Sequence, residues 1–317
     1  MKKHFLTLTI ISMSYLSNAQ DIEFSQFYAA PLYLNPAFAG TDSAARFGFN
    51  YRDQWPNMHG TFVDYSLAYD QYVNALHGGL GVMVWNENAG SGTMKTEDIS
   101  AIYSCQFNVT SDFTINAGIQ GSYMQNSIDY SKIVYPKTYS IPGPLYDPIQ
   151  NKSSINYFDF SAGLLGYTKE FYAGINFAHL SKPNVGLLVQ NQPLFIKTTA
   201  NFGAMIPLDD NIRNRSYLSP NIIYISQQNL IQYNLGLEIE HGPLTGGIYY
   251  RLSNSNGDGI IALIGLQVWR FGFSYSYDIT ISGLSNYSGG ANEISIACLF
   301  NSKKNHTTSR RINSPSF

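Results

Sequence analysis

FGFSYSYDI, residues 271–279, alternates apolar and polar side chains without interruption. Aromatic and aliphatic residues occupy the odd positions from Phe271 to Ile279, while glycine, serine and aspartate occupy the even positions. Because successive side chains of a β-strand point to opposite faces of a sheet, this stretch predicts a strand with one apolar and one polar face. Both a soluble sandwich and a membrane barrel contain such strands, so the rest of the chain has to decide between them.

The same alternation recurs in segments of about ten residues from about Ala44 to Phe300. Combined with turn signals, it predicts fourteen strands. The segment 217–226 departs from the pattern, because Pro220 cannot donate to a ladder and is expected at a strand start or a bulge. The predicted strands lie near residues 44–52, 61–70, 78–87, 98–108, 113–125, 156–167, 170–180, 197–207, 217–226, 230–240, 244–252, 259–268, 271–280 and 292–300.

The composition favours a membrane barrel. Of 317 residues, 44% are hydrophobic and only 13% are charged, with 24 Tyr and 19 Phe, whereas soluble domains carry about 25% charged residues. Low charge with many aromatic residues suits a sheet that faces lipid on one side and a lumen on the other. After the amino terminus, no stretch offers the roughly 20 apolar residues of a spanning helix. The sequence therefore predicts an all-β fold, a transmembrane antiparallel β-barrel.

The connections between the predicted strands also alternate. Turns after even-numbered strands are mostly short, at residues 110–112, 168–169, 241–243 and 269–270, with longer exceptions at 71–77 and 208–216. Connections after odd-numbered strands are mostly long, at residues 88–97, 126–155, 181–196 and 282–291. Outer-membrane barrels have an even number of strands, short periplasmic turns and long extracellular loops. This layout predicts a bacterial outer-membrane location with both termini in the periplasm.

The parity of the strands places polar side chains in the lumen. Arg46, Arg52 and Arg251 are expected to pair across the lumen with Asp159, Asp278 or Glu293, and no ladder of like charge marks a selective pore. A substrate pathway remains the alternative interpretation. The other predicted lumen-facing residues are Thr114, Asn116, Gln120 and Ser122 on the fifth strand, and Gln232, Asn234, Glu238 and Glu240 on the tenth.

Residues 1–19 are typical of a secretory signal peptide. Lys2 and Lys3 precede an apolar run, and small residues end the segment before Gln20. A short buried helix is the alternative. Removal of the two lysines from 19 basic against 21 acidic residues changes the formal net charge from −2 to −4, which argues against nucleic acid as a partner. Cys105 and Cys298 lie on different predicted strands and are expected to act as small apolar residues.

Two segments do not alternate. Residues 20–43 contain Pro31 and Pro36, which prevent a regular strand or helix, and they are too aromatic for a disordered linker. We expect them to form a short plug in the lumen or at its periplasmic mouth, ahead of a barrel over residues 44–300. Residues 301–317 form a basic periplasmic tail that can reach a partner or an anionic membrane surface, unless it is a disordered, solvated end.

Three amino-terminal motifs resemble the PorP/SprF family of Bacteroidota: FSQ at 24–26, PLYLNPAFAG at 31–40 and YRDQWP at 51–56. The carboxyl end, RRINSPSF at 310–317, is similar to the basic end of the family, but it has Ser314 where cysteine is frequent. The resemblance implies an outer-membrane barrel of the type IX secretion system, in a family of which some members serve gliding adhesins. The implied partners are outer-membrane lipid, a secreted adhesin or other cargo, and periplasmic secretion-machinery proteins.

The motifs that carry this resemblance also indicate which residues form the plug or bind a partner. Phe300 ends the last strand and is expected to belong to the barrel-insertion signal, with an ordinary girdle aromatic as the alternative. The residues expected by resemblance at the plug or partner site are Phe24, Gln26, Tyr33, Asn35, Pro36, Arg52, Trp55, Arg310, Arg311 and Phe317.

The sequence predicts no enzymatic activity, cofactor or metal site. The histidines stand in separate segments without zinc-ligand spacing. His179 and Ser181 form the nearest Ser–His pair, and His179 is expected in a turn or in the aromatic girdle. The alternatives to a protein-binding barrel are a transport barrel for small or hydrophobic molecules, and a membrane hydrolase, which would need a Ser, a His and a carboxylate that converge.

Overall fold

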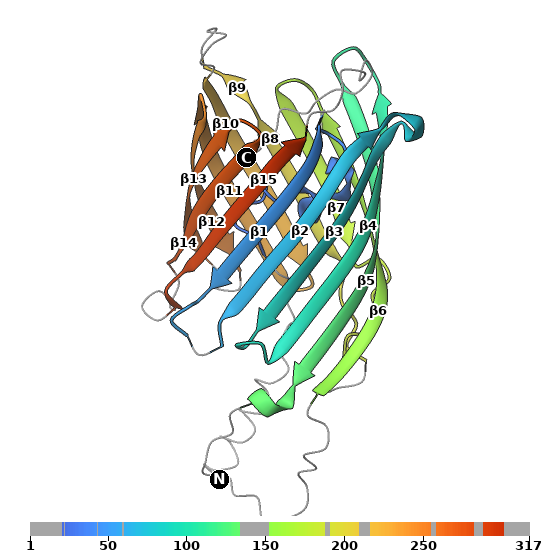
Figure 1. Ribbon diagram of the computed structural model, residues 1–317, viewed down its shortest axis with the longest axis vertical. Helices are drawn as coiled ribbons and strands as arrows, with labels where there is room; N and C mark the ends of the chain where they lie inside the picture. Colours follow the sequence, from blue (N-terminus) through green and yellow to red (C-terminus); the bar gives the residue numbers. More distant parts are fainter. Residues whose placement is uncertain are drawn as a thin grey trace, which may run out of the picture.

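Fourteen antiparallel strands form one closed barrel (Figure 1). This computed structural model describes residues 21, 23–42, 44–58, 60–133, 152–187, 191–208, 216–254, 258–281 and 288–300. Each strand pairs with its neighbours in sequence, and pairing of the first strand with the last closes the barrel. The strands are β1 (Ala45–Gln54), β2 (Phe62–Val73), β3 (Gly78–Ala89), β4 (Met94–Asn108), β5 (Thr114–Asp129), β6 (Lys152–Tyr167), β7 (Phe171–Ala178), β8 (Lys197–Ala204), β9 (Ile206–Pro207), β10 (Ser216–Gln227), β11 (Leu230–His241), β12 (Leu244–Ser253), β13 (Gly259–Val268), β14 (Phe271–Thr280) and β15 (Ala291–Phe300).

All fourteen predicted strands are present, and β8 with β9 forms one of them, interrupted at Met205. The pairing with β10 passes from Gly203 opposite Asn221 to Ile206 opposite Leu218. Pro220 therefore lies beside the interruption, where β10 pairs with neither β8 nor β9. This is the irregular position that a proline in a strand was expected to occupy.

Helical structure in the described residues is confined to short turns. None of these helices is long and apolar enough to cross a membrane. They are α2 (Pro31–Leu34) and the 3₁₀ turns η2 (Pro36–Phe38), η3 (Asn74–Leu76) and η4 (Tyr130–Lys132).

The two ends of the barrel differ in their connections. At the short-turn end, most connections are tight, at residues 74–77, 109–113, 168–170, 242–243 and 269–270. The opposite, long-loop end carries the connections 130–151, 179–196 and 281–290. The predicted loop at 88–97 is wrong, because β3 and β4 continue as a hairpin and only residues 90–93 turn. Apolar and polar side chains no longer alternate where both faces of a hairpin meet water, although the backbone pairing continues.

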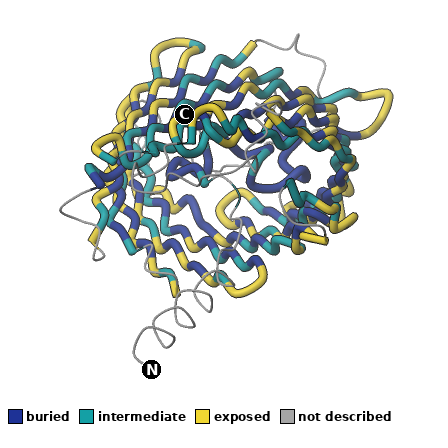
Figure 2. The backbone as a smooth tube through the Cα atoms, turned by 90° about the horizontal axis from the view of Figure 1, so that it is seen from below, coloured by how far each residue is buried: buried dark blue, intermediate teal, exposed yellow. Residues whose placement is uncertain are grey.

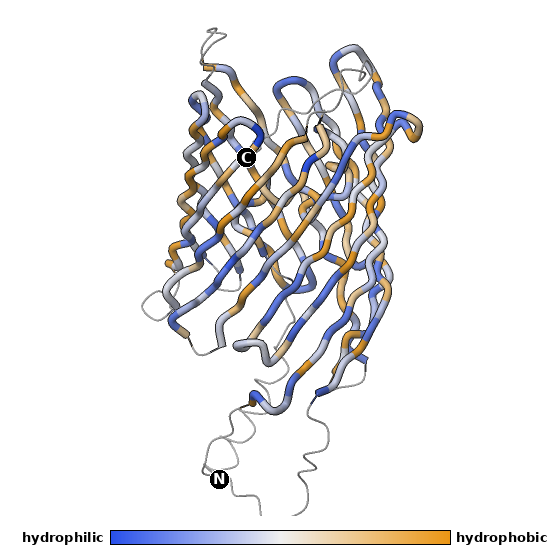
Figure 3. Tube along the Cα trace, viewed as in Figure 1, coloured by the Kyte–Doolittle hydropathy of each residue, from blue (hydrophilic) through white to orange (hydrophobic). Residues whose placement is uncertain are grey.

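The apolar and polar faces have the predicted orientation. On β14, the side chains of Phe273, Tyr275 and Tyr277 are exposed on the outside, whereas Ser276 and Asp278 are buried. Hydropathy alternates along the strands in the same way (Figure 3). Of the predicted lumen residues on β5 and β11, only Gln120 and Glu240 are half-buried rather than buried; the buried ones are Thr114, Asn116, Ser122, Gln232, Asn234 and Glu238.

Residues 23–42, here called the inner segment, lie inside the ring of strands (Figure 2). Just before this segment, Asp21 contacts His179, which follows β7 at the long-loop end. The segment finishes towards the short-turn end, where Gly40 N donates to Asp70 Oδ2 at 2.8 Å. The even strand count brings the start of β1 and the end of β15 together at the short-turn end. The inner segment, however, crosses the lumen before β1, so the described chain begins in the other half of the barrel.

Glycines in the barrel wall make room for the inner segment. A Cβ atom at Gly118 on β5 would overlap the backbone of Ala37, and one at Gly79 on β3 would overlap the backbone of Ala39. Strand interiors usually carry glycine only where another group must approach closely. The wall and the inner segment are therefore fitted to each other at the level of the backbone.

The closing seam between β1 and β15 can be tested with a native cysteine. Cys105 and Cys298 are both free, and Phe47 on β1 lies directly opposite Cys298 on β15. We expect Phe47→Cys, with Cys105 replaced by serine, to form a disulfide with Cys298 on mild oxidation, because opposed Cα atoms lie about 4.5–5.5 Å apart. Denaturing gels with and without reductant would detect this link between the two ends of the barrel. Gly48→Cys points into the lumen and should stay reduced; equal cross-linking of both variants would refute the register.

Candidate functional site

Glu293 on β15 anchors the start of the inner segment. Its carboxylate accepts hydrogen bonds from the backbone N–H groups of Ser25, at 2.6 Å, and Gln26, at 3.1 Å. The Gln26 side chain donates to Ser276 Oγ at 3.2 Å and accepts from Ser274 Oγ at 2.5 Å. All five residues are buried. A buried carboxylate that accepts backbone N–H bonds holds the chain at this point in one position.

Two arginines balance the charge of this anchor. Arg52 on β1 lies 3.3 Å from Glu293 and 3.4 Å from Asp278, and Arg251 on β12 lies 2.5 Å from Asp278. Arg52 also donates to Ser25 Oγ. Two cations and two carboxylates from four strands therefore meet around the inner segment. This confirms the predicted pairing of Arg52 and Arg251 with Asp278 and Glu293.

The predicted partners of Arg46 and Asp159 are wrong. Arg46 pairs with Asp70 at 2.9 Å and with Asp42 at 3.8 Å, while Asp159 binds His179 at 2.5 Å. Arg46 lies near the short-turn end of β1, far along the strand from Arg52. Strand parity identifies the face of a residue but not its height in the barrel, so it could not choose between partners.

Asn35 joins the inner segment to the wall between β6 and β7. Its side-chain Nδ2 donates to the carbonyl oxygens of Leu164, at 3.1 Å, and Ile175, at 3.2 Å. Its Oδ1 accepts from Ala37 N at 2.9 Å and thereby caps η2, in which Pro36 occupies the first turn. The Asn-Pro pair therefore both starts a turn and fixes that turn to two strands.

An aromatic cluster fills the lumen beside these polar anchors. Phe24 and Tyr33 meet edge to face with ring centroids 5.4 Å apart, and Tyr33 meets Trp85 of β3 at 6.3 Å. Burial of such side chains contributes about 1.5–3 kcal/mol each. The cluster consists of Phe24, Ala30, Leu32, Ala39, Met83, Trp85, Ile102 and Met124, with Tyr33, Ala68 and Tyr157 packed against it.

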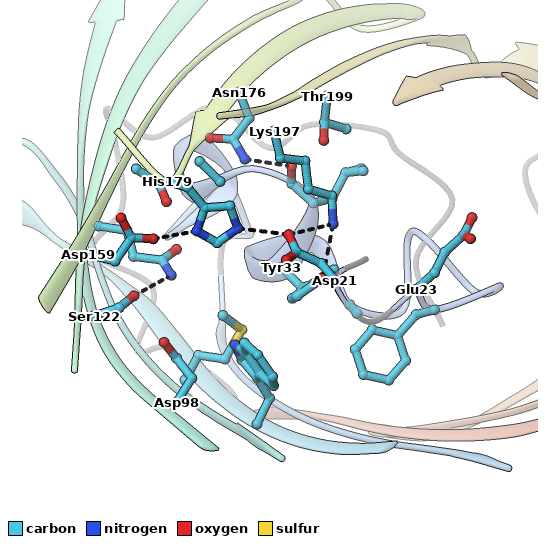
Figure 4. A pocket seen from close by; sticks show the side chains of 18 of the residues that line it. Asp21, Glu23, Tyr33, Asp98, Ser122, Asp159, Asn176, His179, Lys197 and Thr199 are labelled. Atoms are coloured by element: carbon cyan, nitrogen blue, oxygen red, sulfur yellow. Dashed lines mark hydrogen bonds and ion pairs between the residues drawn. The ribbon is translucent and has the colours of Figure 1, made fainter. Parts of the chain in front are cut away.

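A cavity of about 70 Å³ remains beside the inner segment, and ionisable groups line one side of it (Figure 4). His179 contacts Asp159 Oδ2 through Nδ1 at 2.5 Å and Asp21 Oδ2 through Nε2 at 2.8 Å. Lys197 lies 3.4 Å from Asp21 and donates to the Tyr33 hydroxyl at 3.1 Å. These contacts link residues at the start of the described chain to β6, β8 and the end of β7.

The electrostatics of this cluster favour the charged forms. Burial alone would lower the pKa of His179, but Asp21 and Asp159 outweigh burial and raise that pKa to about 9. Burial would likewise raise the pKa of Asp21, but His179 and Lys197 hold it well below its usual range. At neutral pH the imidazolium therefore donates from both ring nitrogens, and two cations face two carboxylates.

This arrangement does not form a catalytic triad. Ser181 Oγ donates to Asp159 Oδ1 at 2.6 Å and not to His179, whose two nitrogens are both bound to carboxylates. A general base needs an unprotonated nitrogen directed at the nucleophile. His179 begins a turn, in which Lys182 N donates to the His179 carbonyl oxygen at 3.1 Å, so its expected place in a turn is confirmed. Its side chain is only 7% exposed inside the barrel and is not part of an aromatic girdle. Within the described residues, no group of three or more His, Cys, Asp or Glu side chains could hold a metal ion.

Most of the site residues expected by resemblance lie inside the barrel, at two anchors of the inner segment and in the aromatic cluster between the strands. Trp55 lies apart from them and is half-buried after β1. Its backbone N–H donates to Gly290 O at 2.8 Å, and its ring meets Phe62 edge to face. Phe300 is exposed at the end of β15, and its role in insertion stays a prediction. The residues that lie inside the barrel are Phe24, Gln26, Tyr33, Asn35, Pro36 and Arg52.

The remaining predictions about the chain ends lie outside the described residues. These are the signal peptide over residues 1–19, the tail from residue 301, and the tail residues Arg310, Arg311 and Phe317. Sequence reasoning also missed Asp21 and Lys197 as members of the ionisable cluster. Asp159 could have indicated them, because a carboxylate that faces the lumen requires a cation at the same level along the barrel axis.

Comparisons with known proteins agree with this architecture. A family model described as "Type IX secretion system membrane protein PorP/SprF" matches residues 16–298. A search of curated proteins gave no match. Among solved structures, the P. putida toluene transporter TodX is similar, with a TM-score of 0.51 and 10% identity over 85% of this chain and 93% of that chain. The CymD monoaromatic hydrocarbon channel has a TM-score of 0.47 and 13% identity, over 86% and 93%. At such identities, the TodX likeness extends to the fold alone.

Proposed function

Because the chain belongs to the PorP/SprF family of type IX secretion system membrane proteins, we propose that it is a non-enzymatic docking barrel of the outer membrane. In this proposal it binds a secreted surface protein, such as an adhesin used in gliding, and contacts periplasmic components of the secretion machinery. In this proposal the barrel fixes the protein in the outer membrane, and the activity of the protein is binding of another protein rather than catalysis.

The observation that carries this proposal is the occupied lumen. The inner segment is held by hydrogen bonds to several strands beside a buried ion pair of the wall, and only about 70 Å³ of space remains in the cavity beside it. A transport barrel needs a continuous pathway, whereas a docking barrel needs a rigid frame. We propose that the inner segment acts as a fixed plug, which supports docking over transport of small or hydrophobic molecules.

The proposed orientation follows the connections. Long loops of outer-membrane barrels face the outside and short turns face the periplasm, so the long-loop end would meet the secreted protein. β15 ends at the short-turn end, which would place the basic tail from residue 301 in the periplasm. Arg310 and Arg311 could there contact acidic surfaces of the machinery.

Affinity purification from detergent-solubilised outer membranes tests the docking function. The tagged barrel should recover both secretion-machinery proteins and a secreted surface protein, each identified by mass spectrometry. A variant with Arg310→Glu and Arg311→Glu serves as a matched control, since it should lose the periplasmic proteins and keep the surface protein. Recovery of neither class by the unaltered chain would refute the docking function.

A further inference from the structure

One strand edge of the barrel projects beyond its neighbour. β6 pairs with β5 over its whole length, from Lys152 opposite Asp129 to Tyr167 opposite Thr114. β7 pairs only with the last part of β6, from Ala162 to Tyr167. The chain after β7 continues along this edge for a few residues, because Leu180 N donates to Phe160 O at 3.0 Å and Ser181 Oγ lies 3.2 Å from Phe158 O. Beyond that point, no described residue pairs with this edge over residues 152–157.

The free edge carries regularly spaced backbone groups. Phe160 directs its carbonyl towards the β7 side, and backbone groups of alternate residues in a strand point the same way. The β5–β6 register is continuous, so Lys152, Ser154 and Asn156 direct their N–H and C=O groups away from β5. At about 3.3 Å per residue, the free edge is about 20 Å long, the length of an ordinary strand.

This edge lies in water rather than in lipid. The outward-facing pairs of the β5–β6 hairpin change from aromatic to polar towards the long-loop end. Tyr123 and Phe158 pack with ring centroids 5.2 Å apart, the next outward pair is the hydrogen bond of Gln125 to Asn156, and the last is an ion pair of Asp129 with Lys152. The hairpin therefore leaves the apolar belt at about Phe158, and its free edge begins there.

From this geometry we propose that the β6 edge over residues 152–157 binds an extended segment of the secreted partner, which adds a strand to the barrel wall. A row of backbone donors and acceptors is complementary to another extended backbone, and strand addition of this kind is a recurring mode of peptide recognition. The edge has no proline and no bulge, the features that usually block such pairing, and Lys152 is its only charged residue.

The connection at the tip of the same hairpin is a poor alternative occupant. Residues 134–151 contain Pro136, Pro142, Pro144 and Pro148, so every window of six residues in that stretch includes a proline, a residue that is depleted in strands. Proline cannot donate to a ladder. The incoming strand instead needs about six extended residues with no proline at the alternate positions that direct their N–H groups at the edge, and apolar side chains alternating to face Ile155 and Tyr157 on the inward side of the hairpin.

Proline and alanine variants separate backbone pairing from side-chain contact. Ser154→Pro with Asn156→Pro removes two N–H donors from the free edge and leaves the β5 ladder intact. Ser154→Ala with Asn156→Ala keeps both donors. We expect the proline variant to recover at least about tenfold less secreted surface protein in the purification above, and the alanine variant to recover the normal amount. Equal recovery by the proline variant would overturn the inference.

Photo-crosslinking identifies what lies on the edge. With p-benzoylphenylalanine at residue 154, irradiation of whole cells should yield an adduct with a short, extended segment of the secreted protein. An adduct with residues 134–151 of the same chain, or with a second copy of it, would overturn the inference. Because the inference rests on the docking function, the controls separate the two: recovery of the surface protein by both variants refutes only the edge, and recovery by neither variant nor the unaltered chain refutes the docking function as well.

Discussion

Replacement of Glu293 by alanine should destabilise the folded barrel by about 3–5 kcal/mol, because removal of one partner leaves a buried charge without compensation. Of the two carboxylates that pair with it, Arg52 would keep Asp278, which Arg251 already engages at 2.5 Å. The backbone N–H groups of Ser25 and Gln26 would lose their acceptor. The loss therefore affects the barrel seam and the inner segment together.

Two measurements would detect this loss. Denaturant unfolding of the purified barrel in micelles reports the free energy of unfolding, and limited chymotrypsin digestion reports release of the inner segment through cleavage after Phe24, Phe27 or Tyr28. All three aromatic residues are buried in the intact protein, so they should resist cleavage. Glu170→Ala removes an exposed carboxylate and should change the stability by no more than about 0.5 kcal/mol.

A double-mutant cycle isolates the ion pair from the rest of the site. Arg52→Ala together with Glu293→Ala removes both charges and leaves Asp278 with Arg251, so the double variant should be less destabilised than the sum of the single variants. Coupling energies of about 0.5–3 kcal/mol are typical of residues in one network. Strict additivity, or a Glu293→Ala barrel as stable as the unaltered protein, would contradict the role assigned to this pair.

The strands and the faces of the barrel could be predicted because both follow from a period of two. The stretch 271–279 separated the two faces of β14, the composition of the chain identified the apolar face as the outward one, and the same parity placed Asn234 and Glu238 in the lumen. The heights of residues along the barrel could not be predicted, because they depend on the register between strands. For that reason Arg52 received the right partners and Arg46 did not.

The ionisable cluster could not be predicted for a different reason. Asp21, Asp159, His179 and Lys197 come from separate segments, and Asp21 reaches His179 and Lys197 because the chain enters the lumen before the inner segment. The path of that segment is irregular and has no periodicity to read. One signal was present in the wall: inward-facing glycines on neighbouring strands indicate that another backbone approaches closely there.

The wall glycine Gly118 gives the most direct test of whether the inner segment closes the lumen. A valine side chain at this position would overlap the backbone of Ala37, so the inner segment must shift or leave. Valine also has a higher β-propensity than glycine, so β5 itself should not weaken. In planar lipid bilayers we expect the unaltered barrel to be silent and Gly118→Val to conduct at least about tenfold more, because barrels of 16–18 strands without a plug enclose an aqueous channel and fourteen strands approach that size.

The same strand supplies the matched control. Gly121 on β5 faces outward, and a Cβ atom there would meet Phe160 at 3.8 Å, an ordinary contact. Gly121→Val therefore makes the same change in composition and should leave the bilayer silent. Deletion of residues 23–42 sets the upper limit of conductance, since it removes the inner segment altogether. If the deletion variant is silent, the inner segment does not close the lumen; if Gly121→Val conducts as well as Gly118→Val, the conductance does not arise from displacement of that segment. If Gly118→Val conducts and Gly121→Val stays silent, the lumen is closed by an inner segment whose backbone fits against the wall glycines.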